Sequence, residues 1–464
     1  MGIHQRILRL TGAQHARLFK HLLPGDGLEA VAVALCGRHV TDGTSTLTIH
    51  KILPIPHEKC ERRRARITWP TELAMDVIEE ATRKGMGILK IHSHPGPGYF
   101  DRFSDVDDES DRELFPSLHA WTDDGLPHAS AVMLKDGRVF GRFVSSDGEF
   151  SQIDRVAVAG DDIQFFDLRS VECADSDVQL RTRQAFGDKT TLLLRSLRIG
   201  IAGCSGTGSW VAEQLARLGV GEIVLVDPDR VERKNLNRII GTSAGDADAH
   251  RVKVEAIAAR LRTYGTKVHV LTYPSSAAER PVADVLATCD ILFGCMDSVI
   301  GREVLNRIAV FYLIPYIDLG VQLRADGKGG IDTICGSVHY LLPDGSSLLS
   351  REVYTPEMLR TEDLLRADPD RYAAELKAGY IRGVAVGAPA VVSINGLCAS
   401  TAVNELLARL HPYRIEPNNA FRWQQFDLVN SYWQNWECGD PCKALAKYAG
   451  RGDILPFLNC HLVT

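Results

Sequence analysis

The sequence predicts an α/β protein in which a mixed α/β domain is followed by a Rossmann-like, doubly wound domain. Two observations predict this class. Helical and strand patterns alternate along most of the chain, and a glycine-rich turn follows a short apolar run near residue 203. The 464 residues, 45% of them hydrophobic, are enough for two or three domains with cores of their own.

Composition excludes several classes of function. The net charge of −6 argues against a general nucleic-acid-binding protein, because phosphate binding needs a basic excess. The sequence contains no run of about 18 apolar residues, the length needed to cross a membrane. The N-terminal segment has too short an apolar core for a signal peptide. Eleven cysteines without disulfide-framework spacing predict reduced thiols. We therefore expect a soluble, cytoplasmic protein.

The first domain is predicted over residues 1–155. Helices are expected where apolar positions recur three and four residues apart, and strands where short apolar runs lie between turn-forming residues. This assigns helices to 13–23 and 70–85, and strands to 28–37, 45–55, an apolar run ending at 91–94, and a hairpin within 128–144. The acidic stretch after residue 100 is predicted to be a loop.

The rest of the chain divides into three parts. Residues 156–180 are irregular and acidic, which predicts a linker. Residues 181–430 alternate apolar strands with amphipathic helices, the pattern of a mostly parallel sheet covered on both faces. Residues 431–464 are predicted to be a C-terminal tail.

A glycine turn opens the second domain. "LRIGIAGCSGTGSW" places Gly203, Gly206 and Gly208 after a strand and at the start of a helix. Glycines there let backbone N–H groups at the helix N-terminus approach a phosphate chain. Asp227 ends the next strand, where a carboxylate can accept hydrogen bonds from ribose hydroxyls. By itself this pattern fits a nicotinamide dehydrogenase equally well.

The charged residues downstream favour a triphosphate instead. The candidates for binding the cofactor are Asp227, Asp229, Asn235, Arg238, Lys253 and Asp297. Arg302 follows Asp297 by five residues. A site for hydride transfer does not require several cationic side chains and additional carboxylates near the glycine turn. A site that binds ATP with Mg²⁺ needs both.

Residues 181 to about 410 resemble the adenylating domain of the ThiF/MoeB and ubiquitin-activating-enzyme family. The matching segments are "RTRQAFG", the glycine turn, the Asp-x-Asp stretch with Asn-Leu-x-Arg, the lysine, the Asp-x4-Arg step and "GAPAVVSINGLCASTAVNEL". The resemblance implies that the glycine turn binds ATP and that Asp227 binds the ribose. It implies phosphate contacts for Asn235, Arg238 and Lys253, with Arg238 and Lys253 catalytic, and Mg²⁺ binding by Asp297.

The same resemblance implies a homodimer, because Arg183 matches an arginine that reaches into the partner's nucleotide site. The implied reaction is adenylation of the C-terminal carboxylate of a ubiquitin-like protein. It needs positioning and charge neutralisation rather than a covalent protein nucleophile.

Relatives often add a thioester cysteine and a zinc site of two Cys-x-x-Cys pairs. Where one pair often occurs, this chain has Ser347 and Ser350. Cys438 and Cys442, with Cys460 and His461 further on, could form half of a structural zinc site, or be ordinary thiols, or include a transfer nucleophile. No thioester cysteine is assigned.

A second motif lies in the first domain. His92 and His94 alternate at the end of a strand, so both imidazoles point the same way and can share one Zn²⁺ at about 2.0 to 2.1 Å. Asp107 would be the third ligand, leaving a fourth position for water. Ser104 could hydrogen-bond a developing oxyanion, and Glu29, an acid in an apolar run, could be the general base. The alternative is an ordinary surface or core histidine pair.

Residues 1 to about 150 resemble the JAB/MPN (JAMM) metalloprotease family, whose pattern is an upstream Glu, then His-Ser-His-Pro, then Ser-x-x-Asp. Nine residues separate His94 from Ser104, two more than this pattern usually has, and Asp105 and Asp108 lie beside the expected ligand. The resemblance implies hydrolysis of peptide or isopeptide bonds after the tail of a ubiquitin-like protein.

The leading hypothesis is a bifunctional enzyme of a prokaryotic-type ubiquitin-like pathway, which activates a modifier through ATP and Mg²⁺ and processes or removes it through Zn²⁺. Its partners would be the modifier and a conjugating enzyme. Two alternatives stay open: sulfur-carrier activation for cofactor biosynthesis, and a catalytically silent scaffold that binds the modifier.

Overall fold

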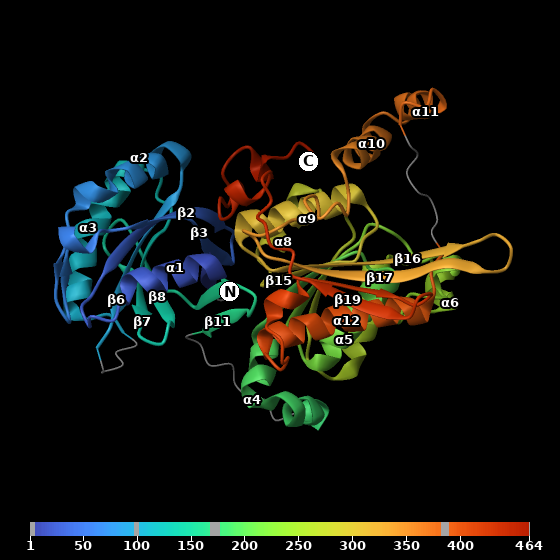
Figure 1. Ribbon diagram of the computed structural model, residues 1–464, viewed down its shortest axis with the longest axis horizontal. Helices are drawn as coiled ribbons and strands as arrows, with labels where there is room; N and C mark the ends of the chain where they lie inside the picture. Colours follow the sequence, from blue (N-terminus) through green and yellow to red (C-terminus); the bar gives the residue numbers. More distant parts are fainter. Residues whose placement is uncertain (1–4, 97–101, 168–176, 382–388, 464) are drawn as a thin grey trace. The chain divides into compact units, whose positions relative to one another are not determined.

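The computed structural model describes residues 5–96, 102–167, 177–381 and 389–463 (Figure 1). It divides into two compact units. Unit 1 comprises residues 1–170 with 310–313 and 448–459, and unit 2 comprises the remainder. Among the described residues, no helix combines the length and the apolar character that a membrane crossing requires.

Unit 1 is built on a nine-stranded mixed sheet in the order β11-β10-β1-β3-β2-β6-β7-β8-β9. Its strands are β1 (Gln5–Thr11), β2 (Val31–Val40), β3 (Thr44–Pro54), β6 (Gly87–His94), β7 (His128–Leu134), β8 (Val139–Val144), β9 (Phe150–Gln152), β10 (Arg155–Ala159) and β11 (Gln164–Asp167). A separate small ribbon pairs β4 (Glu61–Arg62) with β5 (Ile67–Thr68).

Helices cover both faces of this sheet, and each face has its own core. Helix α1 (Gly12–Leu22) contributes Leu18 and Leu22 to one cluster of buried side chains. Helices α2 (Met75–Lys84) and α3 (Asp105–Thr122) pack on the other face, where Ile78 and Phe115 join Val31 and Val33 of β2. Alternate residues of β2 therefore serve the two cores, as the pleat of a strand requires.

Two predictions for this part of the chain are wrong. The acidic stretch is not a loop, because Ser104 caps an 18-residue helix, α3, whose first-turn acids suit the helix N-terminus. The first domain also does not end at 155, because β10 pairs in parallel with β1 and β11 extends the edge. Part of the predicted linker 156–180 is thus sheet.

Unit 2 has an eight-stranded sheet in the order β14-β13-β12-β15-β16-β17-β18-β19. The first five strands are parallel and the last three antiparallel. The parallel strands are β12 (Arg198–Ala202), β13 (Glu222–Val226), β14 (His269–Tyr273), β15 (Ile291–Gly294) and β16 (Tyr316–Ala325), and the others are β17 (Ile331–Leu341), β18 (Trp423–Asp427) and β19 (Tyr432–Trp436). This parallel core agrees with the predicted Rossmann-like fold.

Unit 2 also contains helices, several of which pack on the two faces of its sheet. They are α4 (Leu180–Ser196), α5 (Gly206–Leu218), α6 (Ala244–Asp248), α7 (Lys253–Leu261), α8 (Arg280–Ala287), α9 (Val299–Tyr312), α10 (Pro356–Ala367), α11 (Pro369–Lys377) and α12 (Val392–Leu410). Helix α12 packs along α5, and Figure 1 shows α8 and α9 on the opposite face. Strand order reverses between β12 and β15, the place where ligands bind in open α/β sheets.

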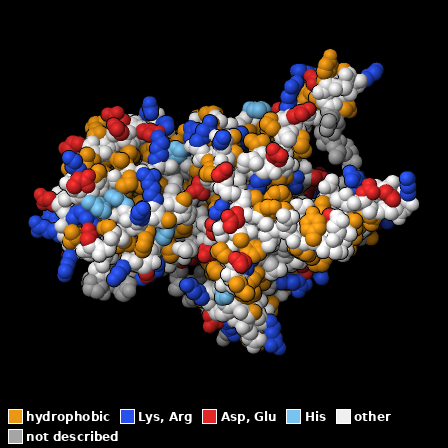
Figure 2. Space-filling model, in the orientation of Figure 1, with side chains coloured by type: hydrophobic (Ala, Val, Ile, Leu, Met, Phe, Trp, Pro, Cys, Tyr) orange, Lys and Arg blue, Asp and Glu red, His pale blue; other side chains and the backbone are white. Residues whose placement is uncertain are grey.

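The predicted boundary at 430 falls within the β18–β19 hairpin, so the C-terminal tail does not begin there. On the face shown in Figure 2, basic and acidic side chains are interspersed, in keeping with a net charge that is small for a chain of this size.

Candidate metal and nucleotide sites

The glycine turn between β12 and α5 leaves no room for side chains. Gly203 has φ of 91°, which favours glycine. A Cβ on Gly208 would lie 1.8 Å from the carbonyl oxygen of Gly203, and one on Gly206 would lie 2.1 Å from Nδ2 of Asn395 on α12. The backbone therefore requires Gly203 and Gly208, and the Asn395 side chain crowds Gly206. The turn places the start of α5 at the carboxyl end of β12.

Two observations show that this helix start fits an anionic group. Ser205, at the N-cap, makes no side-chain capping hydrogen bond. The Nδ2 group of Asn395 is buried, 4% of the residue being exposed, and has no hydrogen-bond partner among the described residues. Unsatisfied N–H groups at a helix N-terminus suit the oxygens of a phosphate. Sequence reasoning missed Asn395, which is distant in the chain.

Lys253, the first residue of α7, joins the glycine turn to the Asp-x-Asp segment. It is 5% exposed. Its Nζ donates to Ser205 Oγ at 3.1 Å and to Asp229 Oδ2 at 2.7 Å, and lies 3.8 Å from Asp227 Oδ1. The structure thus brings together residues that the sequence placed in three separate segments.

Asp227 is held by the backbone at the end of β13. Its Oδ2 accepts from the Cys204 N–H at 2.7 Å and its Oδ1 from the Asp229 N–H at 2.9 Å. Burial raises the pKa of this carboxyl, against the effect of the Lys253 charge. The carboxylate is therefore fixed in direction beside the turn, as a ribose-binding group would have to be.

Asn235 and Arg238 lie on a loop that is tied to α5. The Asn235 side chain is buried and accepts from the Glu232 N–H at 3.0 Å, so it shapes the loop. Ile240 N–H donates to Ser209 Oγ of α5 at 3.1 Å. Arg238 is half-buried and donates to the Lys234 carbonyl oxygen at 2.9 Å.

Asp297 follows β15 and is exposed. Arg302 pairs instead with the buried Asp318 of β16, Nε to Oδ2 at 3.3 Å, and Tyr316 donates to the same oxygen at 2.8 Å. Burial by itself would lower the pKa of Arg302, but the nearby Asp318, Tyr316 and Asp297 outweigh it and raise the pKa. Asp318 was not predicted, although an acid in the apolar run "PYIDLG" was a signal for it.

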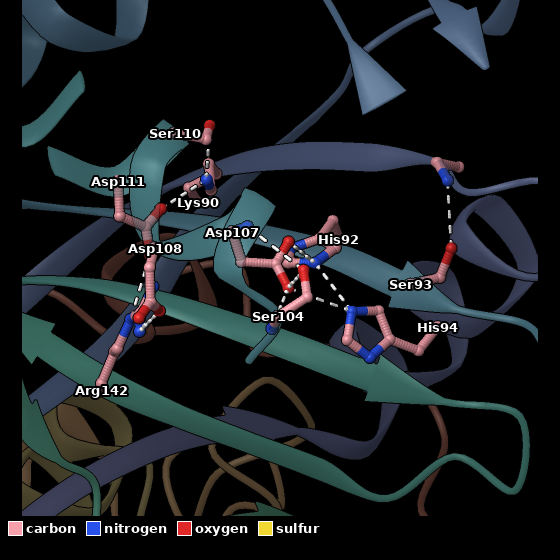
Figure 3. A network of polar contacts seen from close by, with 11 residues as sticks. Lys90, His92, Ser93, His94, Ser104, Asp107, Asp108, Ser110, Asp111 and Arg142 are labelled. Carbon is pink, nitrogen blue, oxygen red and sulfur yellow. Dashed lines mark hydrogen bonds and ion pairs between the residues drawn. The ribbon is translucent and has the colours of Figure 1, made fainter. Parts of the chain in front are cut away.

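In unit 1, His92, His94 and Asp107 form a group whose potential ligand atoms all lie within 4.8 Å of one another (Figure 3). The two Nε2 atoms are 3.2 Å apart, and they lie 2.9 and 3.4 Å from the two Asp107 oxygens. Ligand atoms around a tetrahedral zinc ion are separated by roughly 3.3 Å. Two imidazoles and a carboxylate at this spacing fit Zn²⁺.

The charges of this group are strongly coupled. Burial lowers the pKa of His92, which keeps its imidazole neutral, the form that binds metal. Burial alone would raise the pKa of Asp107, but hydrogen bonds from His92 and His94 hold it well below its usual range. His92 and Asp107 therefore favour the protonation states that a metal needs.

Glu29 comes from the segment just before β2, opposite the end of β6. Val31 pairs with His92, and the Ala30 N–H donates to Ser93 Oγ at 3.0 Å, so the antiparallel register places Glu29 opposite His94. Burial raises the pKa of Glu29 to about 7, with His94 opposing and Asp107 adding to the shift. The register therefore places Glu29 beside the metal group, and its role as a general base stays a prediction.

Ser104 has a structural role that was not predicted. Its hydroxyl donates to Asp107 Oδ2 at 2.7 Å, while its oxygen accepts from the Asp107 N–H at 3.2 Å. The two residues form a capping box at the start of α3. In this arrangement the Ser104 hydroxyl proton is directed at a metal-ligand candidate rather than at an oxyanion.

A family model described as the ThiF family matches residues 177–444. The chain belongs to the ThiF family. The match confirms that family for the second domain, with bounds slightly wider than the predicted 181–430. Residues before 177 lie outside it, so the metalloprotease identity of unit 1 stays a prediction.

Individual relatives of this ThiF chain carry informative names. Over 147 residues it is 31% identical to the adenylyltransferase and sulfurtransferase UBA4 of Meyerozyma guilliermondii, covering 31% of this chain and 33% of that protein. Over 152 residues it is 32% identical to the SAMP-activating enzyme E1 of Haloferax volcanii, covering 33% and 52%. The chain therefore spans about a third to a half of the length of these curated relatives.

Among solved structures, E. coli MccB crystallised with succinimide is 16% identical, with a TM-score of 0.43 over 58% of this chain and 74% of that one.

Two further predictions concern the ThiF region. Arg183 lies on α4, half-buried, with its Nε 3.6 Å from Asp188 Oδ1, and its role in a dimer stays a prediction. Cys438 and Cys442 lie near the 345–350 loop. The Ser346 hydroxyl donates to the Cys438 carbonyl oxygen, and the Cys442 N–H donates to the Gly345 carbonyl oxygen. Neither cysteine belongs to a group of three metal-ligand candidates among the described residues. Ser347 and Ser350 hydrogen-bond each other.

Proposed function

We propose that unit 2 adenylates the C-terminal carboxylate of a ubiquitin-like or sulfur-carrier protein. The observation that carries this proposal is the contact of Lys253 with both Ser205 of the glycine turn and Asp229, which joins a phosphate-binding helix start to a carboxylate pair. Family membership and the names of the relatives, an adenylyltransferase and an E1 activating enzyme, support the same reaction.

In this proposal ATP is a substrate with its phosphates at the start of α5. The turn N–H groups, Asn395 Nδ2 and Lys253 Nζ neutralise and orient the phosphate oxygens, and Asp227 accepts from the ribose. Asp297 would hold Mg²⁺, which supplies further charge neutralisation. An oxygen of the incoming carboxylate attacks the α-phosphorus, the bond to the bridging oxygen breaks, and pyrophosphate leaves with that electron pair.

Replacing Asp297 by alanine tests this assignment. We expect ATP–pyrophosphate exchange, measured with radiolabelled pyrophosphate and the carrier protein, to fall at least about 100-fold, because the phosphates lose a metal ligand. Asp332→Ala removes an exposed carboxylate from β17 and should leave exchange unchanged. Wild-type exchange in Asp297→Ala would refute the role of Asp297.

We propose that unit 1 is a zinc-dependent peptidase that cleaves after the tail of the same carrier protein. His92, His94 and Asp107 would hold Zn²⁺, which supplies Lewis-acid activation of water and of the scissile carbonyl. The Glu29 carboxylate would take the proton of the attacking water and pass it to the leaving amine. Burial of Glu29 at the mouth of a three-ligand group is the observation that supports its role.

Glu29→Gln separates binding from catalysis. We expect zinc to stay bound while cleavage falls by about 10²- to 10⁴-fold, the usual contribution of a general base. The substrate is a carrier protein fused through its C-terminal glycine to a fluorescent protein, and cleavage is followed on gels. Glu113→Gln, on the exposed side of α3, is the matched control and should cleave normally. Full cleavage by Glu29→Gln would assign the base elsewhere.

Adenylation could be followed by sulfur-carrier activation or by thioester transfer to a cysteine, and the cysteines whose thiol pKa is clearly shifted do not favour the transfer. Burial raises the thiol pKa of each described cysteine with a clear shift, namely Cys36, Cys60, Cys204, Cys295, Cys335, Cys398, Cys438 and Cys460. A thioester nucleophile needs a lowered pKa. Mass spectrometry after incubation with ATP and a sulfur donor distinguishes the two: thiocarboxylate on the carrier, or a carrier–enzyme thioester.

A further inference from the structure

Beside the metal group, unit 1 contains a buried cluster of ionic side chains that no proposed catalytic step uses (Figure 3). Asp111 of α3 is fully buried and pairs with Lys90 of β6. Arg142 of β8 donates to Asp111 Oδ2 from Nη2 at 2.6 Å and from Nε at 3.1 Å, and it also pairs with Asp108. Lys90 further donates to Ser110 Oγ at 3.3 Å. We call Lys90, Asp111, Arg142 and Asp108 the anchor cluster.

The anchor cluster repeats the metal group one step along the same two elements. Lys90 precedes His92 by two residues on β6, so both side chains point to the α3 side of the sheet. Asp111 follows Asp107 by four residues on α3, so both face the sheet. Two strand residues advance about 6.7 Å and four helix residues about 6 Å. The Lys90–Asp111 and His92–Asp107 contacts therefore form two adjacent rungs between β6 and α3.

Arg142 also holds the segment that leads into the helix. Its guanidinium carbon lies 3.7 Å from the centre of the Phe103 ring and 3.6 Å from that of Phe150. Phe103 immediately precedes the N-cap Ser104. One side chain therefore fixes both the approach to α3 and its second turn, on either side of Asp107.

We propose that the anchor cluster is a positioning device that sets the metal affinity of His92, His94 and Asp107 by holding α3 in register with β6. This inference rests on the proposed zinc site. Asp107 is the only one of these three ligands that is not on β6, so the distance between its oxygens and the imidazoles depends on where α3 lies. Metal sites need their ligands held to about half an ångström by surrounding groups.

Arg142→Lys in the full chain tests the proposal, because lysine keeps the charge but cannot contact Asp111, Asp108 and Phe103 together. Zinc affinity is measured by competition with a chromophoric chelator, and the absorption spectrum of the Co²⁺-loaded protein reports ligand geometry. We expect zinc to bind about 10- to 100-fold more weakly, with a weaker, shifted cobalt spectrum. Asp108→Asn leaves the Asp111 contacts intact, so it should weaken zinc binding by a smaller but measurable factor, about two- to fivefold.

Arg155→Lys is the matched control. Arg155 is equally buried in the same unit and pairs with Asp167 at 2.6 and 2.8 Å, but on the β10–β11 side of the sheet. We expect both lysine variants to lower the melting temperature of the metal-free protein, and Arg142→Lys alone to weaken zinc binding. If Arg142→Lys does not fold, Asp108→Asn decides, by weakening zinc binding at an unchanged melting temperature or by failing to do so.

Several results would overturn the inference. Equal zinc affinity in wild type and Arg142→Lys would show that the anchor cluster only stabilises the fold. Equal weakening in Arg142→Lys and Arg155→Lys would show a general effect of lost stability. If the wild type binds zinc no better than His92→Ala, the proposed metal site itself is wrong and the inference falls with it.

Discussion

The two sites differ in how much of their polar chemistry is already paired within the chain. In the metal group of unit 1, His92, His94 and Asp107 contact one another, and the anchor cluster continues the pairing. In the nucleotide site of unit 2, Asn395 Nδ2 has no partner among the described residues and Asp297 is exposed. The three ligand candidates of the first site already contact one another, and among their buried ring nitrogens and oxygens only Nδ1 of His92 lacks a partner in the described part of the chain. The second site leaves the Asn395 amide donor and the Asp297 carboxylate for its substrate.

A closed site and an open one should respond differently to mutation. Removing a group from the closed site damages the protein as well as the site, because partners are left unpaired in a buried place. Removing a group from the open site should damage binding alone. The predictions that follow test this difference, starting with the largest expected effect.

Gly208→Ala should abolish nucleotide binding while leaving unit 1 intact. The added Cβ would lie 1.8 Å from the Gly203 carbonyl oxygen, so the turn must move. We expect ATP–pyrophosphate exchange to fall more than about 100-fold, as for a misplaced phosphate-binding group. Gly245→Ala is the control, because its Cβ would meet nothing closer than 3.7 Å. Zinc affinity should be unchanged in both, and a change there would mean that the sites are coupled.

Asn395→Ala distinguishes an open site from a closed one most directly. Since Nδ2 has no partner among the described residues, its removal breaks no hydrogen bond there, and we expect the free energy of unfolding to change by less than about 1 kcal/mol. ATP affinity, measured by calorimetry, should fall about 10- to 100-fold because a hydrogen bond to a charged phosphate is lost. A large loss of stability with normal ATP affinity would make Asn395 a packing residue.

Acid should destabilise unit 1 through His128, a buried histidine of β7 that lies outside the metal group. Burial, helped by the charges of Arg38 and His119, lowers the pKa of His128 to about 2. Its Nδ1 accepts from the Ile88 N–H at 3.0 Å, a bond that protonation removes. Between the unfolded pKa near 6.5 and this folded value, the unfolded state binds the extra proton, so stability falls as pH falls.

His128→Asn should therefore flatten the dependence of unfolding free energy on pH between 3 and 6 by about 1.4 kcal/mol per pH unit. Urea unfolding at several pH values measures it. Asparagine can still accept from Ile88, so the variant should fold at pH 7. An unchanged slope would show that His128 is not the group responsible.

The predictability of the two sites follows from how local their signals are. The glycine turn and the histidine pair are short motifs next to a strand, and both were found from the sequence. Asn395 and Asp318 come from α12 and β16, and their roles depend on packing that no short segment encodes. Strands β10 and β11 are too short to stand out beside an acidic, irregular stretch, and they become sheet because β10 pairs with β1 and β11 pairs with β10.

Helix α3 shows a signal that was present but assigned one function only. The spacing Ser104-x-x-Asp107 was interpreted as a catalytic serine and a metal ligand. A hydroxyl three residues before a carboxylate is also the pattern of a capping box, which predicts a helix starting at residue 105. The proline at 116 and the density of acids concealed the helix that followed.

The two oxygens of Asp107 have two separate roles, one in the capping box of α3 and one in the metal group. Oδ2 accepts from both the backbone N–H and the hydroxyl of Ser104 at 2.7 Å, while Oδ1 lies 2.9 Å from His92. Zinc itself would accept a glutamate or a histidine at this position. A histidine could not also close the capping box, whereas a glutamate, the usual residue at this position of the box, could. The choice of a carboxylate here is therefore dictated by the helix as much as by the metal. Substitution here would exchange a ligand and loosen a helix in one step.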